Sequence, residues 1–167
     1  MNWGVNMRKV NVGKVVNTHG IKGEIRILSG FQFKEKAFKV KNELIIGDKT
    51  YIIKSYRVHK MFDMVTLEGY DNINDVLFLL KKDVYVDEDK LMLNDDEILD
   101  DDLLTYKAIN NKGEVGEVIE VFYASATNKL LRVDFGKKYI VPYRDPFVVS
   151  IDKNKKEIVI ELLEGME

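Results

Sequence analysis

The sequence predicts a mainly β protein, in which two small antiparallel β-barrels are joined by an acidic linker and the first barrel carries one short helix. Three observations predict this fold class. Only four of the 167 residues are alanine, whereas the strand-favouring valine, isoleucine, tyrosine and phenylalanine are frequent. Short runs of alternating apolar and polar residues recur between turn residues. A dense acidic segment interrupts this pattern near the middle of the chain.

Six runs in the first half alternate as half-buried strands do. They span residues 10–16, 24–28, 43–46, 51–53, 64–67 and 84–86. The third and fourth runs flank a glycine-containing turn at 47–49 and predict a hairpin. A further turn is expected at 57–63. Residues 71–81 instead have helical spacing, with apolar residues at 73, 76, 77 and 80 and with Asp71 or Asn72 as the N-cap.

The acidic segment covers residues 87–102 and contains nine Asp or Glu residues against one lysine. Strand alternation disappears there, so we interpret it as a linker between domains. The expected domains are residues 7–88 and 98–167, with the linker at 89–97. A metal site is the alternative, but the segment lacks the glycine and the final glutamate of a calcium loop.

Five alternating runs follow the linker, at residues 108–110, 115–121, 130–135, 138–141 and 157–162. Turns at 111–113 and 136–137 join them into hairpins. Both prolines of the chain fall within residues 142–149 and interrupt the strands there. This half therefore predicts a second β-barrel.

Composition excludes several classes of function. The chain has no cysteine, so disulfides, thiol nucleophiles and thiolate metal sites are excluded. The polar N-terminal residues do not resemble a signal peptide, and no apolar run could span a bilayer, so we expect a cytoplasmic protein without a membrane partner. Residues 1–88 carry 15 Lys or Arg against 11 Asp or Glu, whereas residues 89–167 carry 11 against 17. A basic and an acidic half suggest two surfaces with different partners.

The loop at residues 19–23 admits three interpretations: a phosphate-binding loop, a catalytic histidine or a hairpin turn. A Walker loop is followed by a helix and a KH loop is flanked by helices, but a strand follows Gly23. His19 lacks an adjacent catalytic partner. A metal triad of His19, His59 and Asp63 has no supporting ligand spacing. We therefore expect a turn, with no catalytic residue, metal or cofactor.

Residues 31–41 contain four lysines and three phenylalanines. Basic residues interleaved with aromatic residues are typical of single-stranded nucleic-acid binding. The alternative is that the phenylalanines belong to the core while the lysines are solvated.

Residues 12–27 resemble the opening signature of the RimM family of bacterial ribosome maturation factors, in which V-G-x-[IV] is followed by H-G-[IVL]-[KR]-G-E and a strand. The similarity continues through 65–69, Asp71 and 84–86. In the second half it covers 102–104, 113–118, 140–142, 148–152 and 163–166. The resemblance thus extends over residues 7–166.

The resemblance implies a translation-factor-like N-terminal barrel and a C-terminal PRC-barrel. It also implies a non-enzymatic factor. We separately expect a monomer without a cofactor. Such a factor binds ribosomal protein nineteen of the small subunit and assists small-subunit assembly and 16S rRNA processing. Two alternatives stay open: an RNA-binding β-barrel module, and a PRC-barrel adaptor for another protein.

The matching positions imply roles for individual residues. The expected partner-binding residues are Ile98, Leu99, Asp102 and Leu103. Ile98 and Leu99 stand where family members usually carry an aromatic pair, and Thr105 stands where a glycine is expected. Because the loop at 19–26 is basic and lies in the basic half, we expect His19, Lys22 and Arg26 to contact rRNA or ribosome. The expected structural residues are Gly13, Gly20, Gly23, Gly116 and Pro142.

Overall fold

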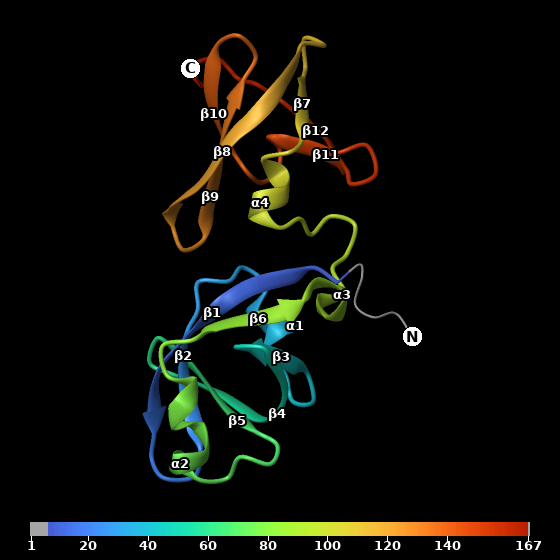
Figure 1. The fold of residues 1–167 in the computed structure, drawn as a ribbon. Coiled ribbons are helices and arrows are strands. Elements are labelled where there is room, and N and C mark those ends of the chain that lie inside the picture. The colour runs from blue at the N-terminus through green and yellow to red at the C-terminus, as the bar shows by residue number, and fades with distance from the viewer. Residues whose placement is uncertain (1–6, 167) are drawn as a thin grey trace. The chain divides into compact units, whose positions relative to one another are not determined.

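The computed structural model describes residues 7–166 (Figure 1). The chain divides into two compact units, and the boundary in the sequence falls between Met92 and Leu93. The structure is mainly β with one sheet in each unit, which confirms the fold class that the sequence predicts. The unit boundary falls within the acidic stretch 89–97, while the limits 7–88 and 98–167 stay predictions.

The first unit is a closed barrel of six strands in the order β1-β2-β5-β4-β3-β6. Pairing of β1 with β6 closes it and removes both free edges. The bounds are β1 Lys9–His19, β2 Glu24–Leu28, β3 Glu43–Ile46, β4 Lys49–His59, β5 Phe62–Leu67 and β6 Asp83–Asp87.

Alternation along these strands fills the barrel with apolar side chains. Ile25 and Ile27 of β2 are fully buried, while Arg26 between them is only half-buried and lies on the outer face. Leu44 and Ile46 repeat the pattern on β3. The period of two therefore specifies which side of each strand faces the core.

Three short helices and a 3-10 turn accompany the barrel: α1 Lys34–Ala37, α2 Ile73–Val76, η1 Leu77–Leu79 and α3 Glu88–Leu91. The predicted helix near residues 71–81 is confirmed as α2 and η1. Its N-cap is Asn72, whose side chain accepts a hydrogen bond from the Asn74 amide at 2.9 Å. The sequence does not reveal α1 and α3, because a single turn is too short to display helical periodicity.

The predicted turn at 57–63 is shorter in the structure. β4 continues to His59 and β5 begins at Phe62, which leaves only Lys60 and Met61 between them. Arg57 therefore belongs to β4 and Asp63 to β5, and both residues are part of the barrel.

The phenylalanines of residues 31–41 pack within the first unit. Phe38 is buried and stacks on Tyr56 with ring centroids 5.9 Å apart. Phe31 and Phe33 are half-buried and meet edge to face at 6.0 Å. These aromatic rings therefore contribute to packing.

The second unit is a six-stranded sheet in the order β10-β9-β8-β7-β12-β11, preceded by α4 Asp100–Leu103. The strands are β7 Lys107–Asn110, β8 Val115–Ser125, β9 Asn128–Asp134, β10 Lys138–Pro142, β11 Val148–Asp152 and β12 Glu157–Ile160. Neighbouring strands are antiparallel except β7 and β12, which pair in parallel. Alternation has the same period in both pairings, so the sequence does not distinguish them.

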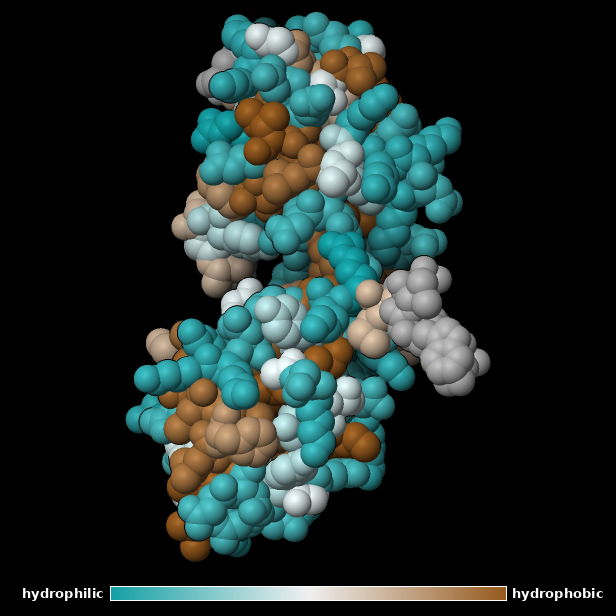
Figure 2. Space-filling view, in the orientation of Figure 1, coloured by the Kyte–Doolittle hydropathy of each residue, from teal (hydrophilic) through white to brown (hydrophobic). Residues whose placement is uncertain are grey.

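The core of the second unit collects apolar residues from α4 and five strands. Leu103 of α4, Ala108 of β7 and Ile158 of β12 are fully buried in it, as are Leu131 and Val141. Hydrophilic side chains cover most of the visible face of each unit, with apolar patches between them (Figure 2). Within the described residues, no helix is long and apolar enough to cross a membrane.

Candidate functional site

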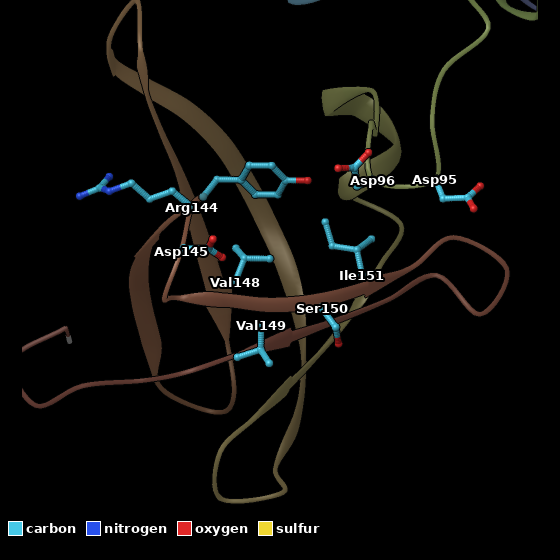
Figure 3. A pocket seen from close by; sticks show the side chains of 9 residues that line it. Asp95, Asp96, Arg144, Asp145, Val148, Val149, Ser150 and Ile151 are labelled. Carbon is cyan, nitrogen blue, oxygen red and sulfur yellow. The ribbon is translucent and has the colours of Figure 1, made fainter.

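The second unit contains a pocket of about 420 Å³ between the acidic segment and β11. We call it the β11 pocket. Its lining residues are Asp95, Asp96, Tyr143, Arg144, Asp145, Val148, Val149, Ser150 and Ile151. Figure 3 shows Val148 and Ile151 projecting from β11 to the side on which Asp96 lies. A bulge between Val148 and Ser150 allows these two residues, three apart, to share a side of the strand.

One hydrogen bond ties the acidic wall of the pocket to the turn after β11, and a second closes a turn within the wall. The ammonium of Lys153, which follows β11, donates to the carbonyl oxygen of Asn94 at 2.7 Å. The carboxylate of Glu97 accepts from the Asn94 amide at 2.8 Å. Asp95 and Asp96 lie between Asn94 and Glu97, and both side chains are exposed.

The lining of the pocket carries an excess of negative charge. Asp95, Asp96 and Asp145 are exposed carboxylates. Arg144 is the cationic lining residue, but its guanidinium donates to the Asn128 amide oxygen at 3.1 Å. In Figure 3 the Arg144 side chain points away from Asp95 and Asp96. The pocket is therefore suited to a cationic ligand surface.

A network beside the pocket joins α4 to β8, β9 and Tyr143. The ammonium of Lys129 lies 2.5 Å from the Asp100 carboxylate and 4.2 Å from the centre of the Tyr143 ring. The Tyr123 hydroxyl donates to the same carboxylate at 2.8 Å. Burial, and then the negative charge of Asp100, raise the pKa of Tyr123, while burial raises the pKa of Tyr143 to about 12.

Tyr143 lines the pocket and carries a hydroxyl group. Its hydroxyl oxygen is buried and has no hydrogen-bond partner among residues 7–166. An unsatisfied hydroxyl is able to donate or accept when a ligand replaces the groups that cover it. The sequence signal for this residue is weak, namely its place in the proline-bounded break at 142–149.

The structure places three of the expected partner-binding residues in the interior. Ile98, Leu99 and Leu103 are 3%, 5% and 0% exposed. Ile98 and Leu103 belong to the core of the second unit, while Asp102 on α4 is half-buried. A role of Ile98, Leu99 and Leu103 in binding stays a prediction. Because these side chains are buried, they would act indirectly, by positioning the exposed residues above them.

The expected rRNA contacts separate into two groups. His19 and Arg26 meet, with Nδ1 of His19 3.0 Å from Nη2 of Arg26. Lys22 is exposed in the turn after β1. The structure also brings His59 to His19, with ring centroids 5.6 Å apart.

Asp63 does not join these histidines. It is 1% exposed, accepts a hydrogen bond from the Tyr56 hydroxyl at 2.6 Å and pairs with the ammonium of Lys34 at 3.0 Å. Residues 7–166 contain no group of three His, Asp or Glu side chains arranged to hold a metal ion.

The expected structural residues occupy crowded or turning positions. Gly23 has φ +86°, and a Cβ there would collide with the Tyr70 carbonyl oxygen, which brings the turn against the segment before α2. A Cβ at Gly116 would collide with the Asp134 carbonyl oxygen. Gly13 lies on β1 close to Leu28, Gly20 begins the turn, and Pro142 ends β10.

Comparison with known proteins identifies both units. Residues 10–91 match the RimM N-terminal domain and residues 100–166 match the RimM PRC barrel domain. A ribosome maturation factor RimM of Geobacillus thermodenitrificans is 36% identical over 168 residues, covering 95% of this chain and 96% of that protein. One of Staphylococcus aureus is 34% identical, covering 95% and 98%.

A crystal structure of a RimM protein from Pseudomonas aeruginosa is 18% identical with a TM-score of 0.46, covering 93% of this chain and 98% of that one. The two domain matches together cover most of the chain, and the two relatives each cover 95% of it. The chain therefore belongs to the RimM family.

Proposed function

We propose that this protein is a non-catalytic assembly factor of the small ribosomal subunit, and that the β11 pocket binds a basic ribosomal protein, number nineteen of that subunit. The observation that carries the proposal is the anchored acidic wall of the pocket. Asp95 and Asp96 stand exposed between two hydrogen-bonded positions, across from the apolar Val148 and Ile151. A lysine or arginine side chain would place its apolar stem on β11 and its charge against the carboxylates.

The charge of the second unit supports this partner. From residue 93 onward the chain carries 16 Asp or Glu against 10 Lys or Arg. Proteins that bind rRNA neutralise phosphates with Lys and Arg, so a ribosomal protein presents a basic surface. Complementary charge raises the encounter rate and orients docking.

Binding of this kind has a consequence for assembly. The carboxylates of the pocket would occupy the same basic side chains that rRNA phosphates occupy in the finished subunit. The factor therefore holds the ribosomal protein until the RNA competes for it, which assists small-subunit assembly and 16S rRNA processing. We expect the factor to act in the cytoplasm as a monomer.

The test compares two variants with the same change in charge. Asp95→Lys with Asp96→Lys reverses the acidic wall, whereas Glu117→Lys with Glu164→Lys reverses two exposed carboxylates that do not line the pocket. Titration calorimetry with the purified ribosomal protein should show at least about a tenfold loss of affinity in the first variant only. An equal loss of affinity in both variants would show that net charge alone explains the effect. That result would contradict the proposed role of the pocket.

A second measurement tests the assembly role. The tagged full chain should co-purify with precursors of the small subunit and with the ribosomal protein, rather than with mature ribosomes. Recovery of neither would refute the proposed function. A different protein recovered through the β11 pocket would favour the adaptor alternative.

A further inference from the structure

The outer face of the first barrel gathers four basic side chains, which we call the cation cluster: His19, Arg26, Arg57 and His59. They come from β1, β2 and β4, and the barrel order places β5 between the last two strands. Met64 of β5 pairs in register with Arg26 on one side and with Arg57 on the other. Residues opposite each other in neighbouring strands project from the same face, so the two arginines flank Met64. Met64 projects from this same face, yet its side chain is fully buried.

Close contacts within the cluster fix its geometry. Arg26 reaches His19 with Nη2 3.0 Å from Nδ1, and the His19 ring lies 5.6 Å from the His59 ring. The Arg26 guanidinium also lies 5.0 Å from the centre of the Phe62 ring. The two histidines, 40 positions apart in the sequence, thus lie on one surface with Arg26.

This surface holds more positive charge than its neighbours neutralise. Glu24 is the carboxylate of the face, and Arg57 already binds both of its oxygens, at 2.9 and 2.8 Å. Arg26, His59 and Lys60 form no ion pair within residues 7–166. Nε of Arg26 is buried there without a hydrogen-bond partner.

The crowding of positive charge affects the free protein. Burial lowers the pKa of His59, and the charges of Arg57, Lys60, His19 and Arg26 lower it further. Glu24 is the acidic group that faces the histidines, and its charge is shared with Arg57. An anion on this surface would offset the repulsion and favour protonated His59.

We propose that the cation cluster, together with Lys60, binds the backbone phosphates of RNA. Guanidinium and imidazolium groups donate charge-assisted hydrogen bonds to phosphate oxygens. Met61, in the turn after His59, is 69% exposed and offers apolar surface to sugars and bases. The first 88 residues carry a net charge of +4, with 15 Lys or Arg against 11 Asp or Glu. The proposal deepens the ribosomal role proposed above, since rRNA supplies the phosphates.

A dependence on pH follows from the histidines. In free protein the lowered pKa of His59 keeps its ring neutral at neutral pH. A bound phosphate raises that pKa, so binding takes up protons. By linkage, RNA affinity rises as the pH falls through the ordinary histidine value of 6.5.

The test uses the full chain and a fluorescein-labelled single-stranded RNA, with affinity followed by fluorescence anisotropy. His59→Gln with Lys60→Gln alters the short β4–β5 turn without touching the core. This variant should lose about tenfold in affinity and flatten the slope of log affinity against log salt by about 0.7 per lost contact. Lys112→Gln in the second unit is the control, since its side chain is exposed and lies outside the cluster. Equal affinities of the two variants would overturn the proposal.

A second readout follows the histidine rings by NMR. RNA should raise the pKa of the His59 ring, and His19→Gln with His59→Gln should abolish the pH dependence of binding. Inorganic phosphate that shifts the rings while RNA does not would assign a free-phosphate site and overturn the RNA assignment. Undiminished ribosomal-protein binding in the Asp95 and Asp96 variant, with RNA affinity lost in the histidine variant, would fail the proposed function alone. RNA affinity unchanged after loss of both histidines would fail this inference alone.

Discussion

The ammonium of Lys34 lies 3.0 Å from the carboxylate of Asp63, whose side chain is only 2% exposed. The lysine belongs to the one-turn helix α1 and the aspartate to β5, so this pair attaches the helix to the barrel wall. The Tyr56 hydroxyl donates to the same carboxylate at 2.6 Å.

Lys34→Met should lower the free energy of unfolding by about 1–3 kcal/mol, because it leaves a buried carboxylate without its counter-ion. The partial exposure of Lys34 places the effect at the lower end of that range. Urea unfolding measures it. Lys39→Met replaces an exposed lysine of the same segment and should change stability by less than about 0.5 kcal/mol. Equal losses would show that the pair does not stabilise the barrel.

The Glu24–Arg57 pair predicts a dependence of stability on acid pH. The hydrogen bond from Arg57 lowers the pKa of Glu24 below 4.5, although burial opposes this. A carboxyl with a lowered pKa stabilises the fold above its unfolded value, and that contribution is lost as the pH falls through the folded pKa. Arg57→Gln should therefore flatten the decline of unfolding free energy below pH 4.5.

Urea unfolding at a series of acid pH values tests this pair. Lys54→Gln is the matched control, because it removes a cation from an ion pair with Asp71 in which both side chains are largely exposed. If the free energy of unfolding falls as steeply with pH in Arg57→Gln as in Lys54→Gln, the Glu24–Arg57 pair is not the source of the pH dependence.

The two glycines of the turn after β1 should respond differently to alanine. Gly20 has φ +69° with open space around it, so Gly20→Ala should cost about 1 kcal/mol from backbone strain alone. Gly23 has φ +86° and contacts the Tyr70 backbone, so Gly23→Ala should cost about 2–4 kcal/mol. Thermal unfolding would show the order of the two variants. A smaller loss at Gly23 would contradict the close packing of this turn.

Leu103→Ala separates a core role from a direct contact with a partner. Leu103 is fully buried, so its truncation should cost about 2–5 kcal/mol of stability. The Asp95→Lys, Asp96→Lys variant should change stability by less than about 0.5 kcal/mol, because both side chains are exposed. Calorimetric unfolding beside binding to the ribosomal protein distinguishes the two roles. A stable Leu103→Ala protein that no longer binds would place Leu103 in the interface.

Local features of the fold are readable from the sequence. The runs at 43–46 and 51–53 lie in β3 and β4, and the turn between them contains the glycine that predicts it. Asn72 caps α2 as its residue type favours. Each of these features depends on residues within a few positions of one another.

The sequence does not predict the candidate sites in the same way. Asp63 follows His59 closely in the sequence, but it is buried with Lys34 while His59 lies on the outer face. Ile98 and Leu99 fall where a binding pair is expected, yet both side chains are buried just before α4. Tyr143 has only a weak sequence signal and lines the pocket.

The sequence by itself determined the alternation of the strands, the turn glycines, the N-cap at Asn72 and the family signature at 12–27, because each is set by local stereochemistry or by residue order. Tertiary structure alone decided the closure of the barrel, the parallel pairing of β7 with β12, the meeting of His19 with His59 and the position of Asp95 across from β11. These relationships join segments distant in the chain. Their geometry depends on strand register and on which side chains are buried together, and no short stretch of sequence contains that information.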